Sequence, residues 1–474
     1  MPAHEAGALH AEGGHRGPTW LRPPEDANAL VTSLWASGVR RGDAGALTIG
    51  GLDVREVARE FGTPAYVIDE DDFRSRAREF KHAFGDVFQE LCGGADVYYA
   101  GKAFLCTAVA RWIHEEGLYL DVCSGGELAV AIRAGLPGDR IGMHGNNKSV
   151  AEIEAALRHG VGRIVVDSFE EIERVAAEAE RLGVVAPVLV RVTVGVEAHT
   201  HEYIATAHED QKFGFSLAGG QAAEAVRRIL NHSEYLSLLG LHSHIGSQIF
   251  DTSGFEVAAR RVLALHLDVA REHGIQLPEL DLGGGFGIAY TTEHDPLSPR
   301  DLAVAMAQIV ERECGADGVP VPKISIEPGR AIAGPSTFTL YEVGIVKEVL
   351  LDGDASRTYV SVDGGMSDNI RPALYDADYS CTIAGRASEA IPTLARVVGK
   401  HCESGDIVVK DEFLPSDIRP GDLLAVPGTG AYCRSLSSQY NHTPRPPVVA
   451  VRAGSARAIV RRETIEDLLT LDID

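Results

Sequence analysis

Short runs of apolar and β-branched residues alternate with amphipathic helical patterns eight times between Asp96 and Arg330. Runs of roughly four to eight such residues predict buried strands, and apolar residues spaced three and four apart predict the helices between them. The predicted strands are Val97–Ala100, Tyr119–Val122, Arg140–His144, Arg163–Val166, Val188–Thr193, Gly240–His244, Glu279–Leu282 and Lys323–Glu327. This alternation predicts an α/β fold, a parallel (β/α)8 barrel of the TIM type.

Two of the predicted helices have defined starting points. Ser149 is followed by Glu152, and Ser168 by Glu171, which is the spacing of a capping box. In this motif the serine hydroxyl and the glutamate carboxylate bind backbone N–H groups that the first helical turn leaves unpaired. We therefore expect one helix to begin just after Ser149 and another just after Ser168.

The pattern changes after about Gly334, where short apolar runs are separated by Gly, Pro and Asp. This spacing is typical of an all-β sandwich or barrel domain. The predicted strands there are Thr358–Val362, Ala395–Gly399, Asp422–Ala425 and Val448–Arg452. A further short strand, Ala46–Ile49, precedes the barrel, and we expect its segment to complete the β domain.

These patterns divide the chain into four parts. Residues 1–28 are rich in Gly, His and Pro and lack periodicity, so they are predicted to form a disordered tail without an assigned function. Residues 29–69 are the N-terminal segment that joins the β domain. The barrel is expected to span 70–335, and the C-terminal β domain 336–474.

Composition narrows the possible partners and location. The chain has 474 residues, a formal net charge of -24 and seven cysteines without a CxxC pair. The negative charge argues against nucleic acid and anionic membranes, because their phosphates would be repelled. Scattered cysteines are typical of reduced thiols in a cytosol, and no apolar run approaches the roughly 18 residues that span a bilayer. We therefore expect a cytoplasmic protein.

Most polar clusters of the sequence follow a predicted barrel strand, where the active site of such a barrel lies. Lys102 follows the first strand in a setting that would desolvate an ammonium and favour a Schiff-base amine, although a surface lysine is the alternative. Gly283–Gly287 can direct backbone N–H groups at a phosphate or form only a tight turn. Glu327 and Arg330 can hold a pyridine nitrogen and an anion, or form an incidental ion pair.

Histidines offer a different interpretation. His242 and His244 lie two apart on a predicted strand, so both would face one side, as in some metal sites. We expect no metal, because no third ligand cluster is evident and because Lys102 and Glu327 have no role in such a site. A second histidine-rich stretch, 199–208, has the pattern of an exposed loop.

Taken together, the clusters resemble the alanine-racemase-like group of pyridoxal-phosphate enzymes, and within it the diaminopimelate decarboxylases. The resemblance runs from about Leu30 to the C-terminus, and several motifs in one order are far more specific than any single motif. The motifs that carry it are Tyr98–Ala103, His199–His201 leading to Lys212–Gly214, His242–Ser247, Glu327–Arg330 and His401–Asp406.

The resemblance implies a role for single residues. Lys102 would carry pyridoxal 5'-phosphate, His244 would stack on its ring, and Glu327 would pair with the ring nitrogen. Cys402 would be the second catalytic residue, returning a proton to the substrate. The residues implied for the cofactor are Lys102, His244, Gly285, Glu327, Pro328, Gly329, Arg330 and Tyr432. Those implied for the substrate are Arg330, Arg371 and Tyr375 at its distal carboxylate, Glu403 at its distal ammonium, and Tyr432.

The implied activity is decarboxylation of meso-2,6-diaminopimelate to L-lysine and CO2, the last step of lysine biosynthesis. The resemblance also implies a homodimer in which Cys402 and Glu403 reach the active site of the partner subunit. An ornithine- or arginine-type decarboxylase is an alternative, disfavoured because Arg371 and Glu403 suit a distal zwitterion. A metal-dependent barrel hydrolase and a non-catalytic regulator on the same fold are the others.

Overall fold

The computed structural model describes residues 17–195, 212–351 and 355–473. The chain divides into two compact units. The barrel unit comprises Arg74–Gly287 and Pro296–Ala331, and the β unit comprises Met1–Phe73, Ile288–Asp295 and Ile332–Asp474. A short stretch inside the barrel sequence, Ile288–Asp295, therefore belongs to the β unit, which the expected continuous boundary of 70–335 did not foresee.

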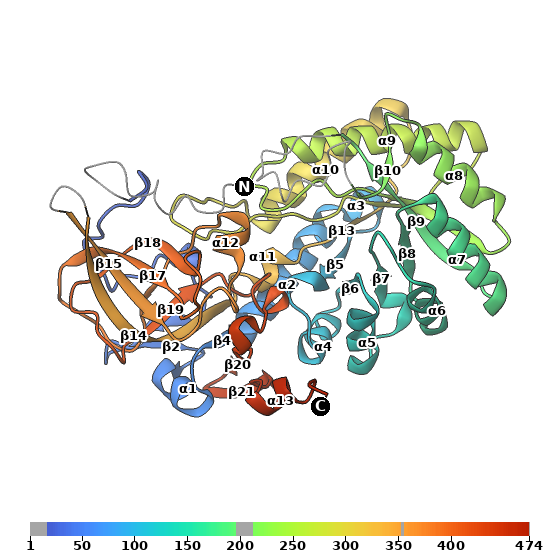
Figure 1. Cartoon of the computed structure of the whole chain (residues 1–474). Helices are drawn as coiled ribbons and strands as arrows, with labels where there is room; N and C mark the ends of the chain where they lie inside the picture. The colour runs from blue at the N-terminus through green and yellow to red at the C-terminus, as the bar shows by residue number, and fades with distance from the viewer. Residues whose placement is uncertain (1–16, 196–211, 352–354, 474) are drawn as a thin grey trace. The chain divides into compact units, whose positions relative to one another are not determined.

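The barrel unit contains eight parallel strands that close on themselves, as the sequence predicts (Figure 1). The strands neighbour one another in the order β5, β6, β7, β8, β9, β11, β12, β13 and back to β5, and the pairing of β8 with β9 and of β13 with β5 closes the ring. Their bounds are β5 Asp96–Ala100, β6 Tyr119–Val122, β7 Ile141–Met143, β8 Arg163–Val166, β9 Ala186–Thr193, β11 Leu236–His242, β12 Glu279–Asp281 and β13 Lys323–Ile326; the two-residue β10, Phe215–Ser216, pairs with β9.

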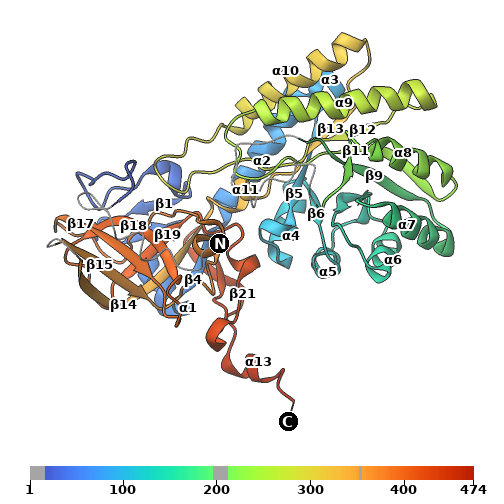
Figure 2. The ribbon, with the colours of Figure 1, turned by 45° about the horizontal axis from the view of Figure 1, so that its top comes forward.

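Helices lie outside these strands (Figure 1). The longer ones bury an apolar stripe against the barrel; α7, for example, buries Ile172, Val175 and Ala179. The long helices α9 and α10 pack side by side (Figures 1 and 2). The bounds are α2 Glu70–Val87, α3 Gln89–Cys92, α4 Thr107–Glu115, α5 Gly125–Ala134, α6 Val150–His159, α7 Phe169–Leu182, α8 Gln221–Asn231, α9 Ser253–His273, α10 Pro299–Asp317 and α11 Arg330–Ala333.

The predicted helix starts are confirmed in position, but only one capping box is complete. Ser149 and Glu152 make both reciprocal contacts at the start of α6. Ser168 accepts a hydrogen bond from the backbone N–H of Glu171 at the start of α7. The carboxylate of Glu171 instead accepts a 2.6 Å hydrogen bond from Nζ of Lys148, because that buried ammonium needs an anion.

The β unit contains a mixed sheet and a small three-stranded sheet. The larger sheet follows the order β18, β17, β15, β14, β4, β20, β21, with β19 also paired to β14 and β16 to β19. The bounds are β1 Val39–Arg41, β2 Leu47–Ile49, β3 Leu52–Asp53, α1 Val54–Phe61, β4 Ala65–Asp69, β14 Thr337–Leu351, β15 Ala355–Val362, α12 Arg371–Tyr375, β16 Thr382–Ile383, β17 Pro392–Val398, β18 Ile407–Pro415, β19 Leu423–Pro427, β20 Val448–Arg452, β21 Ser455–Val460 and α13 Ile465–Leu469.

The N-terminal segment completes this β unit, as predicted. Strand β4 pairs with β14 on one side and with β20 on the other, so it is an interior strand of the larger sheet. Part of the expected tail is also packed, since Leu21 is buried and Asn28 exchanges two hydrogen bonds of 2.8 Å with Ser388. The remaining tail, residues 1–16, lies outside the described residues.

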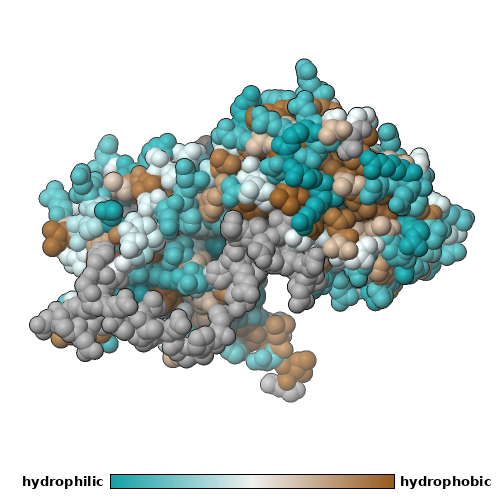
Figure 3. Space-filling model, turned by 90° about the horizontal axis from the view of Figure 1, so that it is seen from above, coloured by the Kyte–Doolittle hydropathy of each residue, from teal (hydrophilic) through white to brown (hydrophobic). Residues whose placement is uncertain are grey.

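Within the described ranges, no helix has both the length and the apolar character needed to cross a membrane. On the face that Figure 3 presents, hydrophilic residues are interspersed with smaller hydrophobic areas.

The buried ion pair of Lys148 and Glu171 provides a test of the barrel's packing. Both side chains are 2% exposed, and burial lowers the pKa of Lys148 and raises the pKa of Glu171. Lys148→Met leaves a buried carboxylate without its cation, so we expect the free energy of unfolding, measured with denaturant, to fall by about 3–5 kcal/mol. The double variant K148M/E171L removes both charges and should recover most of this loss. Arg158→Met at the exposed pair with Glu154 is the control and should cost less than about 1 kcal/mol. Equal effects of K148M and R158M would contradict this account.

Candidate active site

The C-terminal ends of the barrel strands surround one cavity of about 230 Å³. This is the end at which parallel barrels place their active sites. Charged and titratable side chains from six of the strand ends line it, and Lys102, His244 and Glu327, predicted from the sequence, are among them. The full polar set is Lys102, Asp121, Cys123, His144, Asn146, Arg191, His242, His244 and Glu327.

Lys102 lies in a single 3-10 turn, Gly101–Ala103, directly after β5. A Cβ atom at Gly101 would lie 2.7 Å from the backbone oxygen of Asp121, so only glycine allows the turn to approach β6 this closely. The Lys102 side chain is exposed to solvent at the cavity. The expectation that neighbouring side chains desolvate its ammonium is therefore wrong, because the described protein leaves it open.

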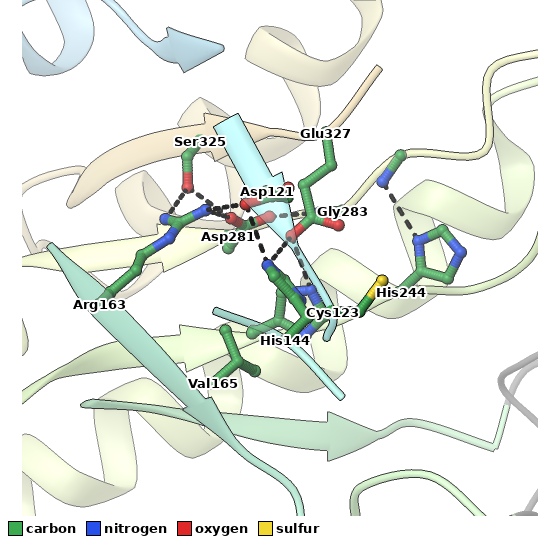
Figure 4. A network of polar contacts seen from close by, with 12 residues as sticks. Asp121, Cys123, His144, Arg163, Val165, His244, Asp281, Gly283, Ser325 and Glu327 are labelled. Carbon is green, nitrogen blue, oxygen red and sulfur yellow. Dashed lines mark hydrogen bonds and ion pairs between the residues drawn. The ribbon is translucent and has the colours of Figure 1, made fainter. Parts of the chain in front are cut away.

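Glu327 follows β13 and is buried against two imidazoles (Figure 4). Its Oε1 lies 3.0 Å from Nε2 of His242, a hydrogen-bond contact, and 3.3 Å from Nε2 of His144. Burial alone would raise the pKa of Glu327, but the facing His144 and His242 outweigh it and hold the pKa well below its ordinary value. The site therefore contains a buried carboxylate that stays ionised.

His244 and the glycine turn after β12 form a second wall (Figure 4). The backbone N–H of Gly284 donates to Nδ1 of His244 at 3.3 Å. A Cβ atom at Gly284 would lie 2.1 Å from the oxygen of Glu327, and one at Gly285, where φ is +101°, would lie 2.3 Å from the oxygen of Gly246. Burial, followed by the charge of Lys102, lowers the pKa of His244 well below its ordinary value, so its ring is neutral.

The turn Glu327–Arg330 is fixed to the first barrel strand. The backbone N–H of Ala100 donates to the oxygen of Pro328 at 3.2 Å, and a Cβ atom at Gly329 would lie 2.9 Å from Cβ of Ala100. The buried guanidinium of Arg330 donates to the hydroxyl of Ser247 at 2.9 Å. Arg330 is thus oriented by a residue of the loop that follows β11.

The β unit holds the other predicted residues. Arg371 begins α12 and is buried, with its guanidinium 4.6 Å from the ring centre of Tyr290 and its Nη1 donating to the hydroxyl of Tyr379 at 2.5 Å. Burial alone would lower the pKa of Arg371, but Tyr290 and Tyr379 raise it above its ordinary value, so the guanidinium stays charged. Tyr375 ends the same helix, and Tyr432 has a left-handed backbone with φ of 61°.

Cys402 and Glu403 lie on a loop held by a buried carboxylate. Asp406 accepts hydrogen bonds from the backbone N–H groups of Met366, at 2.5 Å, and His401, at 2.7 Å. The backbone N–H of Cys402 donates to the side-chain oxygen of Asn441 at 3.4 Å. These contacts fix the backbone, and the thiol of Cys402 is left exposed.

The metal pair considered from the sequence is not formed. Strand β11 ends at His242, so His244 lies beyond it, and the two rings turn to different partners. Among the described residues, one group could hold a cation by its geometry: His144, His242 and Glu327, whose ligand atoms all lie within 4.8 Å of one another. Both imidazoles converge on one oxygen of Glu327, His242 through a 3.0 Å hydrogen-bond contact and His144 through a 3.3 Å ion-pair contact.

Six polar or aromatic residues that line the cavity had no predicted role: Asp121, Cys123, His144, Asn146, Arg191 and Phe213. Two sequence features could have pointed to some of them. Asp121 and His144 lie at the ends of predicted strands, and Arg191 is a charged residue inside an otherwise apolar strand. The histidine motif of the resemblance, 199–201, lies outside the described residues.

The residues present fit pyridoxal phosphate. A primary amine, an ionised carboxylate and a neutral imidazole face one cavity, and these are the groups that anchor an aldehyde, meet a protonated ring nitrogen and stack on a ring. Side chains at Gly284 or Gly285 would collide with the surrounding backbone, so the glycine turn keeps the wall thin enough for an anionic group to approach the main chain.

Comparisons with known proteins agree with this chemistry. Residues 70–334 match the family described as pyridoxal-dependent decarboxylase, pyridoxal binding domain. The chain is 56% identical to diaminopimelate decarboxylase of Mycobacterium leprae over the full length of both. It is 58% identical to that of Mycobacterium tuberculosis, over 94% of this chain and 98% of the relative. The chain belongs to the diaminopimelate decarboxylase family.

A solved family member has the same fold. Diaminopimelate decarboxylase from M. jannaschii, crystallised with L-lysine, superposes with a TM-score of 0.85 at 32% identity, over 93% of this chain and 98% of that one. Membership of the diaminopimelate decarboxylase family confirms the predicted fold, the decarboxylase class and the pyridoxal-phosphate cofactor. It decides against the metal-dependent hydrolase and the non-catalytic regulator. The roles of single residues stay predictions.

The buried ring of His244 gives a pH prediction. Burial and the charge of Lys102 lower the pKa of His244. We therefore expect its imidazole to stay neutral throughout the range in which an ordinary histidine titrates, from about pH 7.5 down to about pH 5.5. Ring-nitrogen NMR shifts, assigned with His244→Gln, measure this directly. A titration midpoint near the ordinary histidine value would contradict the environment described.

Proposed function

We propose that this chain decarboxylates meso-2,6-diaminopimelate to L-lysine and CO2, the last step of lysine biosynthesis, in the barrel cavity. The observation that supports this most directly is the convergence of Lys102, His244 and Glu327 on one cavity in a chain of this family. Each contributes a different chemical property: an amine, a neutral ring and a buried negative charge.

Within the cavity, Lys102 would anchor the cofactor covalently through Nζ, and His244 would lie against the ring. Gly285 and the turn Glu327–Arg330 would bind the rest of it. When bound, pyridoxal phosphate supplies an electron-withdrawing ring that accepts the electron pair left as CO2 departs. Glu327, held ionised, keeps a proton on the ring nitrogen and so maintains this property.

Arg371 supports a substrate with a distal carboxylate. Its guanidinium is buried and charged, yet among the described residues no carboxylate pairs with it, and its Nε has no hydrogen-bond partner there. A buried cation without an anion is costly, so an anionic ligand is its natural complement. We assign Arg371 to the distal carboxylate of diaminopimelate, together with Arg330, Tyr375 and Tyr432, and Glu403 to the distal ammonium.

The same observation disfavours the ornithine- or arginine-type alternative. Substrates of that kind carry a cation and no carboxylate at their far end, which would leave the charge of Arg371 uncompensated. A panel of basic amino acids assayed beside meso-diaminopimelate distinguishes the two.

The exposed thiol of Cys402 is the proposed proton donor to the substrate carbon. We place it, with Glu403, in the active site of a second copy of the chain, so that a homodimer carries two shared sites. The fixed backbone of this loop is consistent with presenting both side chains outward. The predicted cytoplasmic location stays a prediction.

Arg371→Gln tests the substrate assignment. Because hydrogen bonds to charged groups contribute about 1.5–3 kcal/mol, we expect KM for meso-diaminopimelate to rise roughly 10- to 100-fold with a smaller change in kcat. Arg386→Gln, which removes ion pairs to Asp417 and Asp422 elsewhere in the β unit, is the matched control and should leave KM unchanged. An unchanged KM with a lower kcat for R371Q would remove Arg371 from substrate binding.

Mixing two inactive variants tests the shared site. Lys102→Ala and Cys402→Ala should each be inactive alone, whereas their mixed dimers contain one intact site of two, restoring roughly a quarter of wild-type activity. The control is a mixture of Lys102→Ala with Glu327→Ala, which damages both cavities and should restore none. If mixed dimers form and activity does not return, Cys402 acts within its own subunit or not at all.

A further inference from the structure

A chain of buried charged groups extends from Glu327 into the barrel interior (Figure 4). Nε2 of His144 lies 3.3 Å from Oε1 of Glu327 and 3.1 Å from Oδ1 of Asp121. The same Asp121 oxygen lies 3.9 Å from Nη2 of Arg163. The cofactor chemistry described above uses Glu327 but neither His144 nor Asp121, although both line the cavity.

The inner end of this chain is already balanced in charge. Arg163 is fully enclosed, forms an ion pair with Asp281, donates to the hydroxyl of Ser325 at 2.9 Å and lies 3.6 Å from the ring centre of Tyr98. The second oxygen of the Asp281 carboxylate accepts the backbone N–H of Gly283 at 2.7 Å, which ties this ion pair to the glycine turn. Asp281 is thus the main counter-charge of Arg163, and Asp121 is the more distant carboxylate.

Two carboxylates therefore compete for one imidazole nitrogen. Asp121 and Glu327 both contact Nε2 of His144, and two like charges in one buried region cannot both ionise cheaply. Glu327 has the advantage, because it also contacts Nε2 of His242 at 3.0 Å, a contact that Asp121 lacks.

The protonation states follow the geometry. Burial first, and then the charge of Glu327, raise the pKa of Asp121 well above its ordinary value. Burial lowers the pKa of His144 to about 4. The charged and titratable groups that face this pair from the neighbouring strands are Arg163, Arg191, His242, Asp281 and Glu327. These shifts favour the protonated form of Asp121 and the neutral form of His144 beside the ionised form of Glu327.

We propose that Asp121 and His144 act together as positioning residues, filling the space beside Glu327 with a neutral, polar pair that keeps its carboxylate charged for the cofactor's ring nitrogen. This inference rests on the proposed role of Glu327. It assigns a function to the strand ends of β6 and β7 in binding the cofactor, apart from any contact with the substrate.

Paired substitutions separate polarity from packing. His144→Gln keeps a neutral N–H near the position of Nε2, whereas His144→Leu keeps volume alone. We expect H144L to weaken cofactor binding about 10- to 100-fold, as for other residues that orient a ligand-binding group, and H144Q to recover most of it. The measurement is an absorbance titration of the cofactor-free full-length protein with pyridoxal phosphate, without substrate. Equal losses in the two variants would show that His144 acts only by packing.

Asp121→Asn tests the proton. A raised pKa in the folded state means that wild-type protein gains stability at low pH and loses it as pH rises through the folded pKa. Asparagine mimics the protonated acid and cannot titrate, so the melting temperature of D121N relative to wild type should climb as pH rises above about 4, where an unfolded aspartate titrates, to a plateau above the folded pKa. A difference that stays constant with pH would mean that Asp121 is ionised, which overturns the proposal.

These readouts do not depend on the assigned substrate. If the chain fails to decarboxylate diaminopimelate while H144Q and H144L differ in cofactor affinity and D121N shows the pH-dependent gain, the proposed function fails and the positioning pair stands. If decarboxylation proceeds while the variants do not differ, the positioning pair fails alone.

Discussion

The carboxylate of Glu327 must remain charged although it is buried, and the architecture of the site follows from that requirement. An ionised carboxylate is stable inside a protein only where hydrogen-bond donors or cations meet it. Here His242 and His144, from strands β11 and β7, face Glu327 beyond the end of β13. A closed barrel can bring these groups together because its strands all end at one rim.

The interior of the barrel supports this rim through a second set of charges. Arg163 and Asp281 form an ion pair inside the barrel, and Tyr98 covers the guanidinium. Because Asp281 also binds the backbone of Gly283, this buried pair fixes the start of the glycine turn that faces Glu327. Removing either charge would leave its partner buried without a counter-charge, which would destabilise the fold.

Much of this could be predicted from the sequence. Strand and helix periodicity placed the barrel strands to within a few residues at their ends, and the strand-end rule drew attention to Lys102 and Glu327. Periodicity assigns a residue to a strand end but does not say which partner its side chain meets. For that reason the sequence left His242 and His244 open as an alternative metal pair, whereas the structure joins His242 to Glu327.

Other features depend on contacts between distant parts of the chain. The spacing in the sequence predicts Glu171 as the second residue of a capping box. It cannot show that its carboxylate binds the buried ammonium of Lys148, which lies in the loop after β7. Similarly, the composition of residues 17–28 indicates disorder, while Asn28 is held by Ser388, 360 residues further on. Local composition does not record such tertiary partners.

The central claim is that Lys102 holds pyridoxal phosphate in the cavity whose charged wall is Glu327. Borohydride reduction of the cofactor-loaded protein, followed by peptide mass mapping, tests it most directly. We predict a single pyridoxyl modification on Lys102, lost in Lys102→Ala and diminished in Glu327→Ala. Modification of another lysine, or none at all in protein that decarboxylates its substrate, would contradict the account.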